Sequence, residues 1–132
     1  MTVFAAEPGQ PIRETDTPAI DRAALREDLE QHLDGEVRFD TISRALYSTD
    51  ASVYQMEPLG VVVPRSREAL ARLVQICARH RCPLTMRGGG TSQAGQAIGR
   101  GLVADTSKYL HRILELNVAE RWVRVEPGVV LD

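Results

Sequence analysis

Three consecutive valines, residues 61–63 (VVV), constrain the fold of this chain more than any other segment. They form a β-branched run without polar alternation, which is typical of a strand buried on both faces of a parallel sheet, and Pro64 ends the run. Ser66 then offers a helix N-cap, and apolar residues recur at helical spacing over 70–80. The short apolar segment 83–86 (PLTM) follows closely, so we predict a strand–helix–strand unit with a right-handed crossover.

A glycine-rich segment, residues 87–92 (RGGGTS), begins at the carboxyl end of the second predicted strand, where ligands bind in open parallel sheets. Each glycine raises the cost of ordering the backbone by up to about 1 kcal/mol relative to alanine, so three in a row indicate a compensating function. Glycine bares successive N–H groups and admits positive φ, which lets several donors converge on one anion. Thr91 and Ser92 add hydroxyl donors, and the planar guanidinium of Arg87 suits phosphate oxygens. The segment therefore predicts phosphate binding.

Two common phosphate-binding motifs do not match this segment. A P-loop requires lysine where Gln96 follows Gly95, and no serine or threonine comes next to anchor Mg²⁺. The dinucleotide fingerprint G-x-G-x-x-G has Gln93 in its last position, and a helix-forming segment does not follow. Nucleoside triphosphate hydrolysis is therefore disfavoured, and a glycine-rich turn or a close backbone crossing is the alternative interpretation.

The amino-terminal segment, residues 1–20, combines proline, glycine and polar side chains without an apolar period, which predicts a flexible lead-in. Asp21 then offers an N-cap for a helix with a single stripe of leucines, and we expect this packing helix to end near Gly35. Within residues 36–60 we expect a short strand followed by an irregular approach to the core. Asp50 and Tyr54 carry reactive groups there, and turn capping for Asp50 and packing for Tyr54 are the favoured interpretations.

The last third of the chain predicts short strands. Residues 102–105 (LVAD) form one, and residues 113–116 and 122–125 form the arms of a hairpin in which Val123 and Val125 face the core. The chain stops as a new apolar run begins, which predicts a piece of a larger protein.

Composition and charge exclude several classes of protein. With 43% apolar and 26% charged residues the chain is an ordinary globular one, and no run approaches the roughly 18 apolar residues of a membrane-spanning helix. The amino terminus lacks the basic start and apolar core of a secretory signal, so a cytoplasmic location is predicted. Cys77 and Cys82 are too few for a disulfide framework or a zinc site, so we interpret them as free thiols.

The second half of the chain is basic, since residues 61–132 carry 11 basic and 6 acidic side chains. Its arginines are scattered, and few rings are available to stack on bases, so nucleic acid is not a predicted partner. The histidines His32, His80 and His111 have no clustered partners in the predicted elements, which disfavours a metal site.

Four ordered motifs run through this half. They are V-V-V-P at 61–64, P-L-T-M-R-G-G-G-T-S-x-x-G-Q-A at 83–97, G-L-V-x-D-x-S at 101–107 and W-V-R-V-E-P-G-V at 122–129. Together they resemble the start of the FAD-linked oxidases of the vanillyl-alcohol-oxidase type. The similar members are D-lactate, glycolate and D-2-hydroxyglutarate dehydrogenases, and long bacterial proteins in which this flavin module is fused to an iron–sulfur region.

The resemblance implies a loop that holds the FAD pyrophosphate, chiefly through backbone N–H groups. The implied cofactor-binding residues are Pro64, Arg87, Gly88, Gly89, Gly90, Thr91, Ser92, Gly95, Gln96 and Gly128. Pro64 lies on the adenine side, and Gly128 approaches the ribityl or ring portion. Some members attach FAD covalently to a histidine directly after the glycines; Thr91 stands there, which implies non-covalent FAD. We expect Gly89→Val to abolish flavin retention by filling the phosphate path and disfavouring positive φ.

The predicted fold is α+β: a small βαβ-based sheet with covering helices, the first FAD-binding subdomain of this type, plus the opening strands of a second. Residues 21–132 then form a partial FAD-binding domain. Acid–base residues, any metal and any iron–sulfur cluster are expected in missing regions, so no catalytic or metal-binding residue is assigned here.

The implied function is the FAD-binding amino-terminal part of an FAD-dependent oxidoreductase that oxidises a D-2-hydroxy acid. The small-molecule substrate would bind through the missing domains, and an electron-acceptor protein is a candidate partner. The alternative is a non-enzymatic module that binds an anion or a protein through its basic second half.

Overall fold

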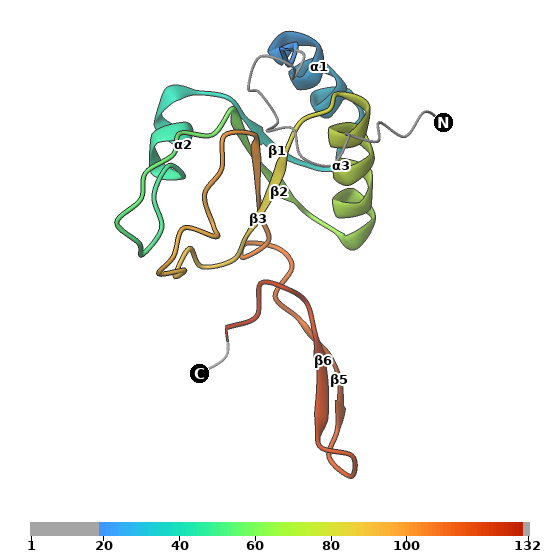
Figure 1. Cartoon of the computed structure of the whole chain (residues 1–132). Coiled ribbons are helices and arrows are strands. Elements are labelled where there is room, and N and C mark those ends of the chain that lie inside the picture. The colour runs from blue at the N-terminus through green and yellow to red at the C-terminus, as the bar shows by residue number, and fades with distance from the viewer. Residues whose placement is uncertain (1–18, 131–132) are drawn as a thin grey trace, which may run out of the picture.

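The structure, a computed structural model, describes residues 19–130, so the lead-in predicted for 1–20 lies almost wholly outside the described residues. The helices are α1 (Arg22–His32), α2 (Thr41–Leu46) and α3 (Arg67–Arg79). The strands are β1 (Gly35–Arg38), β2 (Gly60–Pro64), β3 (Leu84–Arg87), β4 (Leu102–Asp105), β5 (Ile113–Asn117) and β6 (Trp122–Val125). Figure 1 shows β1 to β3 surrounded by the helices, with the β5–β6 hairpin projecting away from them.

The main sheet has the strand order β1-β2-β4-β3. Strands β2 and β3 both run parallel to β4, and β1 pairs antiparallel with β2 at the edge. Every residue of β2 and β4 is buried, which confirms that the valine run is covered on both faces. The predicted strand–helix–strand unit is present as β2-α3-β3, with β4 inserted between its two strands.

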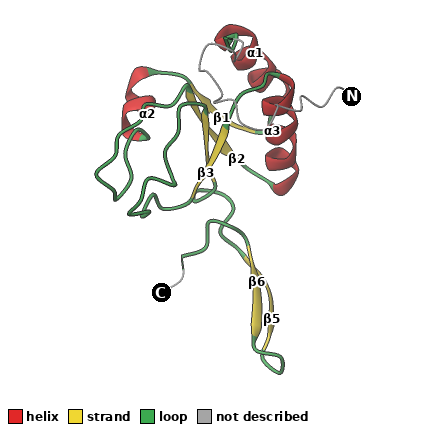
Figure 2. Ribbon diagram, viewed as in Figure 1, coloured by secondary structure: helices red, strands yellow, loops and turns green. Residues whose placement is uncertain are grey.

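Helices α1 and α3 lie on one side of the sheet, and α2 lies on the other (Figure 2). The predicted N-caps are confirmed, because the Asp21 carboxylate accepts from the N–H groups of Ala23 and Ala24, and the Ser66 hydroxyl accepts from the N–H of Ala69. The core between α1, α3 and the sheet includes the fully buried residues Leu25, Leu29, Val62, Leu73, Ile76 and Leu102. Cys77 and Cys82 are buried in the same core as free thiols, as predicted.

The prediction of an irregular segment after the first strand is wrong in one respect, because helix α2 forms there. Asp40 caps it, with its carboxylate accepting from the Ser43 N–H at 2.8 Å. At six residues, α2 is too short to show an apolar period.

The hairpin prediction is right in pairing and wrong in burial. Strands β5 and β6 pair antiparallel, but the side chains of Val123 and Val125 are 49% and 40% exposed. Both were expected to face the core. They are exposed because the hairpin projects from the sheet and no layer within residues 19–130 covers it (Figure 1).

A single carboxylate, that of Asp28 in α1, ties this helix to the end of α3. It accepts from Arg79 Nη2 at 2.9 Å, and the ring nitrogens of His80 and His32 lie 2.8 and 2.9 Å from it. The two histidines therefore share a partner, which corrects the prediction that they have none. Within residues 19–130, no group of three or more His, Cys, Asp or Glu side chains is placed to hold a metal ion.

The Asp28 contacts make part of the stability depend on pH. Hydrogen bonding from Arg79, and then from His80, lowers the pKa of Asp28 to about 2. The folded-state pKa lies below its ordinary value, so the stabilisation is present above about pH 4 and is lost as the pH falls toward 2. We expect Asp28→Asn to lower the free energy of unfolding by about 1 kcal/mol near neutral pH and by much less near pH 2.

Urea unfolding of wild type and variant at the two pH values measures this difference. Asp34→Asn is the matched control, since the Asp34 carboxylate is 66% exposed and its ion pair with Arg65 is 3.7 Å long. An Asp28→Asn effect that stayed constant across this range would contradict the assignment.

Candidate functional site

The glycine-rich loop leaves the sheet at the edge where the parallel strands end. β3 ends at Arg87, which pairs with Asp105 at the end of β4. β2 ends at the same edge with Pro64, which is buried inside the sheet and pairs with Gly35 of β1. The predicted position of the loop at the carboxyl ends of the strands is therefore confirmed.

The loop takes its shape from two glycines in the left-handed region. Gly90 has φ of 69° and Gly95 has φ of 80°, conformations that side chains other than glycine rarely adopt. The prediction of positive φ at Gly89 is wrong, since Gly89 lies outside the left-handed region. At Gly88 and Gly89 an added Cβ would lie 3.9 and 3.7 Å from its nearest neighbour, which is ordinary van der Waals distance, so a first side-chain carbon fits at both positions.

The backbone donors at the glycines and just after them are unused. Within residues 19–130, no hydrogen bond takes up the N–H groups of residues 89–92. The Gly90 carbonyl accepts from the N–H of Ala51 at 3.1 Å. Successive free N–H groups beside side-chain-free glycines fit a phosphate anion.

The hydroxyl and amide side chains that follow shape the loop itself. Ser92 Oγ donates to the side-chain oxygen of Gln96 and accepts from the Gln96 N–H at 3.2 Å. Gly95 lies against the ring of Tyr54, where an added Cβ would come within 3.1 Å of Cδ2. Ser92, Gly95 and Gln96 are thus held together as one turn, while the Thr91 side chain is exposed.

Segment 47–55 packs against this loop, a contact that no pattern in the sequence indicates. Asp50 Oδ1 accepts from the Ser52 N–H at 2.9 Å, so the predicted turn capping is confirmed, and Oδ2 accepts from the Ala97 N–H at 3.4 Å. Tyr47 Oη donates to Asp105 Oδ2 at 2.5 Å across 58 positions. No local pattern marks Tyr47, because its partner lies so far along the chain.

Burial and the Asp105 carboxylate raise the pKa of Tyr47 to about 12. The phenol therefore remains a hydrogen-bond donor at neutral pH. Asp105 is itself buried and also accepts from the N–H and hydroxyl of Ser107, so the end of β4 is fixed on both sides.

The turn after β6 is held by hydrogen bonds at Glu126 and Gly128. Glu126 is buried and accepts from the backbone N–H of Arg112 at 2.9 Å and from its guanidinium at 2.7 Å, which holds the pKa of this carboxyl below its usual range. The Gly128 N–H donates to Leu110 O at 2.7 Å, and an added Cβ at Gly128 would overlap the Thr106 carbonyl oxygen. The close backbone approach explains glycine at position 128, and contact of Gly128 with a cofactor stays a prediction.

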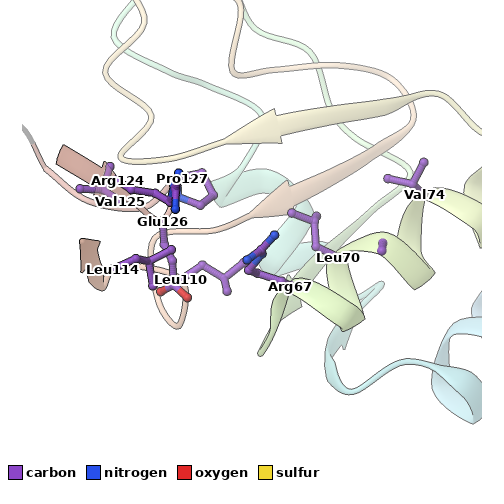
Figure 3. A pocket seen from close by; sticks show the side chains of 10 residues that line it. Arg67, Leu70, Val74, Leu110, Leu114, Arg124, Val125, Glu126 and Pro127 are labelled. Carbon is purple, nitrogen blue, oxygen red and sulfur yellow. The ribbon is translucent and has the colours of Figure 1, made fainter. Parts of the chain in front are cut away.

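A cavity of about 410 Å³ opens between α3 and the base of the hairpin (Figure 3). Its lining is mostly apolar and includes Leu70, Val74, Leu110, Leu114 and Val125. None of residues 88–92 lines it, so this cavity is not the predicted phosphate site. No helix within the described residues is long and apolar enough to cross a membrane.

Comparison with known proteins finds one matching family and several relatives. The FAD binding domain profile matches residues 58–132. The chain is 40% identical over 111 residues to the D-2-hydroxyglutarate dehydrogenase of Escherichia coli strain K12, covering 82% of this chain and 11% of that protein. It is 36% identical over 101 residues to the glycolate oxidase subunit GlcD of Bacillus subtilis strain 168, covering 73% of this chain and 21% of that protein. The chain therefore spans only a small part of these relatives.

The fold is similar to that of a solved structure, 4-ethylphenol oxidase from Gulosibacter chungangensis. The TM-score is 0.67 at 22% identity, and the match covers 86% of this chain and 24% of that one. At this identity the likeness shows the fold alone, and it agrees with the predicted α+β arrangement.

Proposed function

Because the chain belongs to the FAD-binding domain family, we propose that residues 88–92 bind the pyrophosphate of FAD through their backbone N–H groups. The observation that carries this proposal is the set of unused N–H groups at 89–92, beside glycines that place no side chain next to those N–H groups. Their position at the carboxyl edge of β2, β3 and β4 supports it.

The remaining contacts are proposed from the family pattern. Gly95 and Gln96 would continue the lining, Pro64 would lie on the adenine side, and Gly128 would approach the ribityl or ring portion. Thr91 follows the glycines, so attachment would be non-covalent. Any iron–sulfur cluster would belong to regions beyond this chain.

For the whole protein we propose an FAD-dependent oxidoreductase in the cytoplasm that oxidises a D-2-hydroxy acid and passes electrons to an acceptor protein. Both relatives named above bear names of hydroxy-acid oxidoreductases. Bound flavin would supply the chemistry by accepting hydride from the substrate carbon. The residues of this chain would bind and orient the cofactor, and the substrate and acid–base groups would lie in the rest of the protein.

Titration with FAD tests the proposal directly. In ¹⁵N-labelled protein, FAD and inorganic pyrophosphate are each expected to shift the amide signals of residues 89–92 first, because those N–H groups are the proposed donors. Acid precipitation of the protein should release the flavin into the supernatant if attachment is non-covalent. The alternative, a non-enzymatic module docking through its basic surface, predicts shifts that follow scattered arginines instead. Unshifted loop amides at saturating FAD would refute the proposed site.

A further inference from the structure

Arg87 is the residue in this loop whose sequence-based role was phosphate binding, yet its guanidinium lies against the chain's own backbone. Nη1 donates to Thr49 O at 2.8 Å and to Ala97 O at 3.3 Å. An added Cβ at Gly90 would overlap Nη2 and lie 2.7 Å from Cζ, so the loop curves directly over the guanidinium. Arg87 thereby connects the two ends of the loop to segment 47–55.

Asp50 holds the same loop through a second set of contacts. Its carboxylate accepts from the N–H of Ala97, while Ala51, the next residue, donates its N–H to the Gly90 carbonyl. A carboxylate cannot accept a bond from an ionised phosphate and repels it. Whatever Asp50 contributes to binding a diphosphate must therefore come from the shape it gives the loop.

Tyr47 fixes the guanidinium from a third direction. Arg87 Cζ lies 5.1 Å from the centre of the Tyr47 ring, and the phenol is anchored to the buried Asp105 carboxylate at 2.5 Å. The side chain of Arg87 is therefore confined by a ring, two carbonyls and the loop backbone.

We propose that Arg87 and Asp50 are positioning residues that together brace residues 88–97, rather than charges that act on the bound phosphate. This inference rests on the proposed function, since the loop is the proposed FAD site. Binding through backbone N–H groups is strongest when those groups are already held in the binding geometry, and the brace supplies that order before the anion arrives.

Hydrogen exchange of the hydrogen-bonded amides that tie this loop down, those of Ala51, Gln96 and Ala97, tests the brace when it is measured in flavin-free protein beside FAD affinity. Arg87→Lys keeps the charge but removes the planar guanidinium that lies against the Tyr47 ring and beneath Gly90, and Arg87→Met keeps the length without the charge. We expect both to speed exchange across the loop and to weaken FAD binding by about tenfold, equal to about 1.4 kcal/mol. Asp50→Ala should do the same, while Asp50→Asn, which retains one of the two acceptor oxygens that Ser52 and Ala97 use, should lie between Asp50→Ala and wild type.

Direct action on phosphate predicts a different pattern. Arg87→Lys would then keep wild-type exchange and affinity, and Asp50→Ala and Asp50→Asn would both tighten FAD binding by removing a negative charge. Either result overturns the brace. Exchange is measured without flavin, so unchanged loop exchange in all variants refutes the brace even if FAD binds. A wild-type protein that takes up no FAD refutes the proposed function alone.

Discussion

Gly89→Val is expected to leave the fold intact and to weaken FAD binding by about 100-fold or more, since losing two hydrogen bonds to a charged group costs about 3 kcal/mol or more. The nearest neighbour of a Cβ at Gly89 is Thr91 Cγ2 at 3.7 Å, and its φ lies outside the left-handed region. Valine therefore fits the free protein, but its branches stand among the N–H groups that the anion needs. Equilibrium titration with FAD, beside thermal unfolding of the flavin-free variant, measures both effects.

Two variants make this result specific. Gly89→Ala adds one carbon that fits beside Thr91 Cγ2 at 3.7 Å and should weaken FAD binding less than valine does. Gly90→Ala enters the left-handed region and overlaps the Arg87 guanidinium, so it should disturb the loop even without flavin. Wild-type FAD affinity in Gly89→Val would place the cofactor elsewhere. A large fall in the melting temperature would instead show that Gly89 serves the fold.

The family resemblance was confirmed because its signals are local. A β-branched run, a capped helix and a glycine run can each be recognised from a few neighbouring residues. In the structure they are β2, α3 and the loop at 88–92. The insertion of β4 between β2 and β3 is not local, because it depends on which strand edges best bury the valines. Sequence spacing alone gives the strands and leaves their order open.

The predicted burial of the hairpin is wrong although its signal is local. The alternation of Val123 and Val125 correctly indicated a strand with one apolar face, but a sequence pattern does not say whether another layer meets that face. The neighbouring side chains Ile113 and Leu116 are exposed as well, at 69% and 68%. Such an apolar surface is typical of an interaction surface, and within the described residues nothing covers it.

Only part of the candidate site could be predicted from the sequence, for a related reason. Glycines 88–90 are recognisable because their missing side chains are a property of the sequence. The brace is not, because the Arg87 guanidinium and the Asp50 carboxylate bond to backbone atoms of Thr49 and Ala97 that any residue supplies. Arg87 was singled out for its chemistry, and only the structure shows that one of its amino groups is bonded to two carbonyls.

Gly101 lies at a second close approach, where β4 enters the centre of the sheet. The Leu102 N–H donates to Pro83 O at 2.9 Å, and the Leu59 N–H donates to Gly101 O at 2.9 Å. Backbone atoms of two neighbouring segments therefore lie against Gly101. An added Cβ at Gly101 would overlap the Pro83 carbonyl oxygen and lie 2.7 Å from its carbon. These neighbours are backbone atoms that cannot swing aside as a side-chain end can.

We therefore expect Gly101→Ala to lower the free energy of unfolding by about 3 kcal/mol, because the start of β4 must separate from β3 to admit one carbon. Urea unfolding followed by circular dichroism measures this loss. Gly89→Ala is the matched control, the same substitution where the added carbon fits at ordinary contact distance, and should change stability by no more than about 0.5 kcal/mol. Equal urea midpoints for Gly101→Ala and Gly89→Ala would mean that β3 and β4 can separate at this point without loss of stability. The central parallel pair would then not be the rigid support on which the shape of the 88–97 loop depends.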